Sequence, residues 1–106
     1  MNQDLALTKA DISALIARAQ AGDNKAAVKL AFYFDFYERD YDSATFWFKK
    51  AARNGDVKSE YNLGVRLLMQ SKDPEKCREA TFWLKMALAN GMSRARRSLE
   101  ELGPCP

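Results

Sequence analysis

ATFWFKKAARNG, residues 44–55, returns 36 residues later as ATFWLKMALANG at residues 80–91. A fixed period of this length is typical of stacked helical hairpins, in which each repeat buries its apolar face only against its neighbours. The repeated peptide therefore predicts an all-α fold: a short α–α superhelix, a solenoid of about two full helical hairpins with capping helices at its ends. The repeat indicates much less about function, because function depends on particular sites and not on the fold alone.

The composition is that of a small soluble domain. The chain has 106 residues, 47% of them hydrophobic, and its 17 basic and 14 acidic residues give a net charge of +3. We expect one domain over residues 1–106, with a flexible N-terminus at 1–7 and a C-terminal tail at 103–106. No apolar run reaches the ~18 residues that a membrane span requires. Residues 1–8 are polar and include Asp4 where a signal peptide would be basic, so the chain is expected in the cytoplasm.

Histidine and cysteine usage argues against an enzyme. The sequence has no histidine, which removes the commonest acid–base group and the commonest metal ligand at neutral pH. We therefore predict no catalytic residue, no metal site and no cofactor. The two cysteines, Cys77 and Cys105, do not recur with the repeat, and no disulfide framework is expected.

Capping and stop residues predict six helices. Thr8 and Asp11 have the spacing of a capping box, and Pro74 suits the first position of a helix. The Asn-Gly pairs at 54–55 and 90–91 end two helices, because glycine readily takes the left-handed conformation found there. The first helix is expected to start near Thr8, and the others to span about 25–37, 41–53, 57–69, 74–89 and 93–102.

The repeat extends beyond the dodecapeptide when positions are counted from Gly22, Gly55 and Gly91. A small residue stands four positions after each glycine and a leucine stands eight positions after it: Ala26, Ser59 and Ala95, then Leu30, Leu63 and Leu99. Small residues let helices approach closely, and leucines fill the space between them. This pattern, followed by Ala-x-x-Trp-Phe/Leu-Lys-x-Ala-x-x-Asn-Gly, resembles the SEL-one-like repeat, a relative of the tetratricopeptide repeat, over about residues 19–102. The resemblance implies a solenoid that binds other proteins along its inner surface.

Aromatic residues recur with the structural period, and we interpret them as core. They are Phe46, Trp47 and Phe48 in the first copy, with Phe82 and Trp83 in register in the second. Aromatics at helical spacing usually pack between helices, although a platform for stacking a ligand is an alternative. Lys49, Lys50 and Arg53 are interpreted as the solvated face of the same helix.

A second helix face is the predicted binding surface. The helix at 25–37 carries more aromatics than one buried stripe can hold, which places Phe32 and Phe36 on this face. In hairpin solenoids the first helix of each hairpin lines the inner groove. That rule selects Lys25, Val28, Phe32 and Phe36, then Lys58, Tyr61, Val65 and Met69, and finally Arg94 and Arg97. An apolar floor with a cationic edge suits a partner that carries hydrophobic residues and carboxylates, whereas solubilising charge over ordinary helix surface is the alternative.

We therefore predict a non-catalytic protein–protein interaction module that binds one partner, a protein with an acidic and apolar surface, through this groove. The specific alternative is a bacterial immunity protein that neutralises a cognate toxin by direct binding, because stand-alone bacterial proteins of the resembled repeat class include such proteins. A homodimer formed through the apolar groove is a third reading. No membrane contact is expected. Nucleic-acid binding is not expected either, because Glu100 and Glu101 follow the basic cluster at 94–97.

Overall fold

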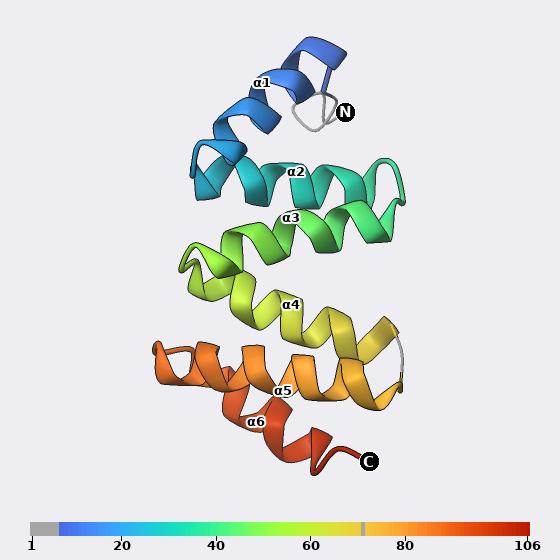
Figure 1. Cartoon of the computed structure of the whole chain (residues 1–106), viewed down its shortest axis with the longest axis vertical. Coiled ribbons are helices and arrows are strands. Elements are labelled where there is room, and N and C mark those ends of the chain that lie inside the picture. Colours follow the sequence, from blue (N-terminus) through green and yellow to red (C-terminus); the bar gives the residue numbers. More distant parts are fainter. Residues whose placement is uncertain (1–6, 71) are drawn as a thin grey trace. The chain divides into compact units, whose positions relative to one another are not determined.

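The structure, a computed structural model, describes residues 7–70 and 72–106, and this part of the chain contains helices and no strand (Figure 1). The predicted all-α class is therefore confirmed. The six helices are α1 (Lys9–Gln20), α2 (Asn24–Phe36), α3 (Tyr41–Arg53), α4 (Val57–Gln70), α5 (Pro74–Ala89) and α6 (Arg94–Leu102). Each expected helix is found within about one turn of its predicted bounds, which is the ordinary spread of helix ends.

Side-chain caps start the helices where the sequence places them. The Thr8 hydroxyl accepts a hydrogen bond from the Asp11 N–H, and the Asp11 carboxylate accepts one from the Thr8 N–H, both at 3.0 Å. This reciprocal pair is the predicted capping box, and it satisfies two N–H groups that α1 leaves without a helical partner. Asp23, Asp40 and Asp73 cap α2, α3 and α5 with their carboxylates.

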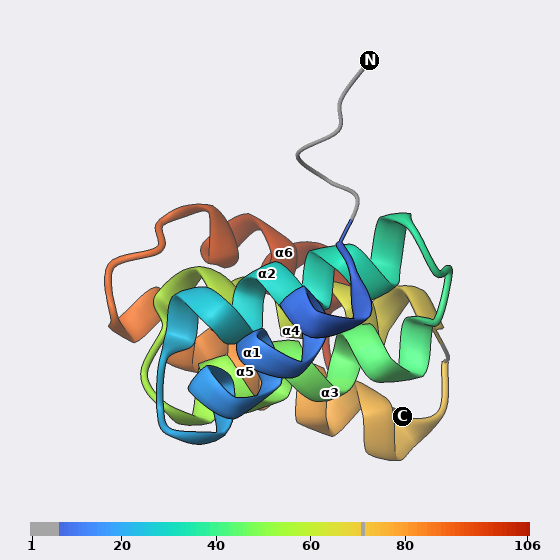
Figure 2. The same ribbon diagram turned by 90° about the horizontal axis from the view of Figure 1, so that it is seen from above.

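Packing divides the chain into two compact units, Met1–Asn54 (unit 1) and Gly55–Pro106 (unit 2). In unit 1, α2 packs against α1 and α3, and in unit 2, α5 packs against α4 and α6. Helices α2 and α3 lie side by side and run in opposite directions, with their connecting turn at the same end of the pair in both views (Figures 1 and 2). Helices α4 and α5 form the corresponding hairpin of unit 2 (Figure 1). The architecture is thus one of repeated helical hairpins.

The rows of small residues and leucines form the interior, as predicted. Ala26, Ser59 and Ala95 are buried, and so are Leu30 and Leu63. Leu99 is partly buried against a cluster of Leu84, Ala87 and Ala95 in unit 2. A Cβ on Gly64 would lie 2.7 Å from the Leu84 Cγ, so the close approach of α4 and α5 depends on this glycine.

The aromatic repeat is only partly core, which corrects the sequence interpretation. Trp47, Phe48 and Trp83 are buried, but Phe46 is 59% exposed and Phe82 is 54% exposed. Each exposed ring stands edge to face on the neighbouring tryptophan, with centroids 4.9 Å apart. Consecutive residues of a helix point about 100° apart, so three in a row cannot all face the same neighbouring helix.

The two cysteines form a disulfide, contrary to the expectation from their spacing. The bond joins Cys77 in α5 to Cys105 in the tail after α6, with the two Cα atoms 5.8 Å apart. The two cysteines do not recur with the repeat, so their spacing does not indicate this pairing. Because α6 packs on α5 and leads the chain back along it, two cysteines distant in sequence meet (Figure 1). The predicted tail at 103–106 is therefore tied to unit 2.

Three further expectations concern the ends and the extent of the domain. Apart from Leu7, the expected flexible terminus at 1–7 lies outside the described residues. A single domain over 1–106 stays a prediction beside the two units found here. None of the described helices has both the length and the apolar character that crossing a membrane requires.

Candidate functional site

Four of the predicted binding residues lie on α2 in unit 1. Lys25 is exposed and Val28 is half-buried, whereas Phe32 is 40% exposed and Phe36 is 65% exposed. The rings of Phe32 and Phe36 stack with their centroids 5.8 Å apart and their planes within 4°. Residues four apart lie above one another on a helix, so these two rings form one aromatic surface.

The Phe32 ring lies partly on this surface and partly in the interior. Its ring also meets the buried Phe48 edge to face, with the centroids 5.3 Å apart. Truncating Phe32 would therefore remove a contact between α2 and α3 as well as a surface ring. Phe36 has the larger exposed fraction, which makes it the better residue for testing binding.

The other six predicted residues lie in unit 2. Lys58, Arg94 and Arg97 are exposed, Met69 is 81% exposed, and Tyr61 and Val65 are half-buried. Tyr61 and Val65 pack against the cluster of Leu84, Ala87 and Ala95, so they contribute to the interior as well as to the surface.

One cation–π contact joins two of these residues. The guanidinium carbon of Arg94 lies 5.8 Å from the centroid of the Tyr61 ring, which links the start of α6 to α4. Arg97 instead donates from Nε to the Glu101 Oε1 atom at 2.9 Å, one turn along the same helix. The structure therefore brings Tyr61 and Arg94 together, and it pairs Arg97 with a carboxylate of its own helix.

A hollow in unit 1 was missed by the sequence reasoning. It has a volume of about 400 Å³ and lies between the α1–α2 turn and the C-terminal half of α3. Its lining residues are Ala19, Gln20, Ala21, Gly22 and Asn24 on one side, with Phe46, Lys49, Lys50, Arg53 and Asn54 on the other. The sequence pattern predicts a core position for Phe46 and a solvated face for Lys49, Lys50 and Arg53. The signal that could have revealed it is the spacing i, i+3, i+4 and i+7 from Phe46 to Arg53, which puts all four on one face of α3.

Two asparagines hold the edge of this hollow. The Asn54 Nδ2 atom donates to the Gly22 carbonyl oxygen at 3.0 Å and to the Asn24 Oδ1 atom at 2.9 Å. In return, the Asn24 Nδ2 atom donates to the Asn54 carbonyl oxygen at 3.3 Å. These bonds fasten the α1–α2 turn to the end of α3, although the residues are 30 to 32 positions apart in sequence.

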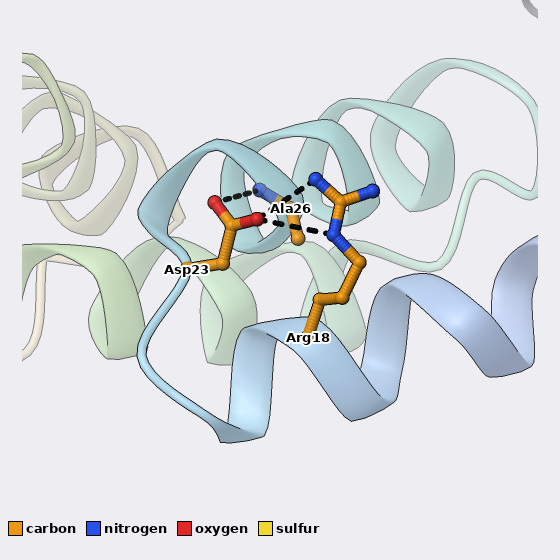
Figure 3. A network of polar contacts seen from close by, with 3 residues as sticks. All are labelled: Arg18, Asp23 and Ala26. Carbon is orange, nitrogen blue, oxygen red and sulfur yellow. Dashed lines mark hydrogen bonds and ion pairs between the residues drawn. The ribbon is translucent and has the colours of Figure 1, made fainter.

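Asp23 stands next to this edge, and its carboxylate is already engaged (Figure 3). Its Oδ2 atom accepts hydrogen bonds from the Arg18 Nη2 and Nε atoms at 2.8 and 3.1 Å. Its Oδ1 atom accepts one from the Ala26 N–H at 3.2 Å. The Arg18 hydrogen bond, followed by the Ala26 N–H, lowers the pKa of Asp23 below its ordinary value.

Unit 2 contains a buried carboxylate. Glu60 is 1% exposed, and its two oxygens accept from the Asn90 Nδ2 atom at 3.1 and 3.3 Å. Among the described residues, no group of three acidic, histidine or cysteine side chains has the arrangement of a metal site. The Asn90 amide thus supplies the hydrogen bonds that a buried carboxylate requires.

Comparison with models of protein families, with curated proteins and with solved structures finds no match to this chain. The resemblance to SEL-one-like repeats therefore rests on the residues of the chain alone. The exposed side chains of α2 and unit 2, together with the hollow of unit 1, are the features on which a function can be argued.

Proposed function

We propose that this chain is a SEL-one-like repeat protein, a short α–α solenoid that binds one protein partner and has no catalytic activity or cofactor. The proposed contact residues are Lys25, Val28, Phe32 and Phe36 on α2 in unit 1, and Lys58, Tyr61, Val65, Met69, Arg94 and Arg97 in unit 2. The Phe32–Phe36 stack carries the proposal, because it exposes two adjacent aromatic rings to water. Aromatic residues are enriched among the side chains that dominate binding energy at interfaces.

Basic residues at one repeat position of each unit determine the chemistry of the partner that we propose. Lys25, Lys58 and Arg94 occupy the same position after Gly22, Gly55 and Gly91, and all three are exposed. An acidic surface with apolar side chains complements such a set, and opposite charges also accelerate the encounter of two proteins. We accordingly propose an acidic, partly apolar protein surface as the partner.

The test is capture of the partner from the native host with two matched variants. Phe36→Ala/Lys25→Glu alters the proposed surface, and Phe82→Ala/Lys85→Glu makes the same changes on α5, where Phe82 is similarly exposed. We expect the first variant to weaken binding of the purified partner by about 30-fold, which corresponds to the ~2 kcal/mol of an interface hot spot. The control variant should bind like wild type. Isothermal calorimetry measures both.

Each outcome of this test assigns the chain differently. Equal binding by both variants and wild type would overturn the α2 surface, and equal loss in both would show that the effect is general. A captured toxin, neutralised by the purified chain, would make the chain an immunity protein. Recovery of only the chain itself, with a dimer seen by light scattering, would favour self-association.

The compartment in which the chain works needs a separate test. The sequence analysis predicts the cytoplasm, whereas the Cys77–Cys105 disulfide favours an oxidising compartment, because structural disulfides are rare in the cytosol. Fractionation of the native host, with alkylation of free thiols before lysis, would show where the chain resides and whether the bond is formed there.

A further inference from the structure

We propose that the hollow of unit 1 binds a small anion that carries an aromatic ring, of which a nucleoside monophosphate is the simplest biological example. The site uses Phe46, Lys50 and Arg53 on α3 with the α1–α2 turn opposite them. It involves none of the residues of the proposed protein-binding surface, so it stands or falls independently of that function.

The wall formed by α3 combines a ring with cations. Phe46, Lys49, Lys50 and Arg53 all line the hollow. The Phe46 ring is 59% exposed, and its edge-to-face contact with the Trp47 ring restrains its orientation. A fixed, exposed ring is a stacking surface for a base. Arg53 lies two turns after Phe46 on α3, and an arginine can donate two parallel hydrogen bonds to a phosphate. Lys50 lies one turn after Phe46 and can add a further positive charge.

None of the described residues that line the hollow beside Lys50 and Arg53 is acidic. Asp23 lies between the lining residues Gly22 and Asn24 in the sequence. Its carboxylate accepts hydrogen bonds from Arg18 and from the Ala26 N–H (Figure 3). The opposite wall is neutral and contributes the amides of Gln20 and Asn24. The net charge of the lining is therefore positive, which attracts an anion. The volume of about 400 Å³ lies within the ordinary range of small-molecule sites.

The second copy of the dodecapeptide shows that the fold does not require these cations. Phe46 and Lys49 are repeated as Phe82 and Lys85, but the positions of Lys50 and Arg53 hold Met86 and Ala89. Helix α5 forms with these neutral residues at the same positions. Lys50 and Arg53 are thus additions to the repeat that only unit 1 carries.

The experiment is an NMR titration of the ¹⁵N-labelled chain with AMP, adenosine and inorganic phosphate in parallel. The side-chain amides of Asn24 and Asn54 report on the edge of the hollow, and that of Asn90, at the matching repeat position, is an internal control. We expect AMP to shift Asn24 and Asn54 and to bind at least about tenfold more tightly than adenosine or phosphate, because it engages ring and cations together. Asn90 should not shift.

Two variants test the assignment of residues. Lys50→Met/Arg53→Ala installs the residues of the second copy, and Arg78→Ala/Lys85→Met removes the same charges from α5 as a control. We expect the first variant to weaken AMP binding by about tenfold or more and the control to leave it unchanged. Lys50 and Arg53 also lie in the last turn of α3, where cations stabilise a helix, so thermal unfolding is measured for each variant.

The proposal is overturned by any of three results. One is the absence of shifts at Asn24 and Asn54 with millimolar AMP. A second is equal AMP affinity in wild type and Lys50→Met/Arg53→Ala, irrespective of any change in the melting temperature of the variant. The third is equal affinity for AMP and adenosine, which would mean that the cations are not used.

Discussion

Units 1 and 2 contain related copies of one dodecapeptide, yet the asparagine near its end has a different partner in each. Asn54 binds the exposed α1–α2 turn through the Gly22 carbonyl and the Asn24 amide. Asn90 donates to the buried carboxylate of Glu60. Five residues after Gly22 stands Ala27, whereas five residues after Gly55 stands Glu60, so only unit 2 offers a carboxylate at this repeat position. A repeated sequence thus specifies a repeated backbone, while the residues packed against it specify what each copy does.

Other differences between the units follow the same division. Unit 2 has the buried Glu60–Asn90 pair, the disulfide and the glycine contact of α4 with Leu84. Unit 1 has the cationic hollow and the stacked rings of α2. We infer that unit 2 depends more on specific interior contacts and that unit 1 keeps more of its chemistry on the surface.

The largest difference should come from the disulfide of unit 2. Cys105→Ser opens a loop with a sequence separation of 28 residues, and closing a loop of this size contributes about 3.5 kcal/mol to the free energy of unfolding. Urea denaturation measures the loss. Hydrogen exchange should accelerate in α5 and α6 while α2 and α3 keep their protection. Reductant should weaken wild type to the level of the variant and leave the variant unchanged; a wild type indifferent to reductant would contradict the prediction.

The paired asparagines give the next largest effect. Asn90→Ala leaves the buried Glu60 carboxylate without its amide partner, and we expect a loss of about 2 kcal/mol. Asn54→Ala breaks exposed hydrogen bonds and should cost only about 0.5 kcal/mol. Both asparagines follow the last residue of a helix, so the difference between the two variants isolates the contribution of Glu60.

Glu60 itself supplies the control for this comparison. Glu60→Ala installs the residue that unit 1 carries at the same position, and added to Asn90→Ala it should recover part of the lost stability. Urea denaturation of the two single variants and the double variant forms the cycle. Equal losses for Asn90→Ala and Asn54→Ala would show that the buried pair has no special role.

A substitution at Gly64, where α4 closely approaches α5, should change the free energy of unfolding less. Gly64→Ala places a Cβ 2.7 Å from the Leu84 Cγ. The cost of overpacking exceeds the helix-propensity gain of alanine, so we expect a net loss of about 1 kcal/mol. In the L84A background, where the facing side chain is gone, the same change should become neutral or stabilising. Stabilisation by Gly64→Ala in the wild-type chain would show that α4 and α5 separate easily.

Acid should affect unit 1 through its capping carboxylates. Hydrogen bonds from Thr8, Arg18 and Ser43 are the leading causes that lower the pKa of Asp11, Asp23 and Asp40 below 3.8. A carboxyl group whose pKa is lowered by folding stabilises the native state above its unfolded pKa, and this contribution is lost as the pH falls through the folded value. Unit 1 should therefore lose stability as the pH falls below about 3.8.

The effect is small because these groups are exposed, and it is best followed by NMR of the amides of α1 and α2 during acid titration. Asp23→Asn should have a flatter stability profile below pH 3.8 than wild type. Asp40→Asn, which leaves the Arg18–Asp23 pair intact, is the matched control for the α1–α2 turn. Identical acid profiles for wild type and Asp23→Asn would contradict the assignment.

Much of the fold could be predicted from residues whose effects are local. Thr8 with Asp11, Pro74 and the Asn-Gly pairs act within a few residues of the chain, so the helix bounds followed from them. The rows of small residues and leucines could be predicted as interior because they recur in register. Phe46 and Phe82 could not be placed, because the repeat shows that a residue recurs but not which way it points.

The sequence by itself determined the six helices, their repetition and the interior rows of small residues and leucines, because capping, helix periodicity and turn preference are short-range properties. Only the tertiary structure decided that Cys77 meets Cys105, that Asn90 reaches Glu60 while Asn54 reaches Gly22, and that Phe46 and Arg53 face a hollow. Each of these depends on how one helix lies against another, which brings together residues about 30 positions apart in the chain. Such contacts have no local signature, because each forms only when the segments that carry its residues are packed together.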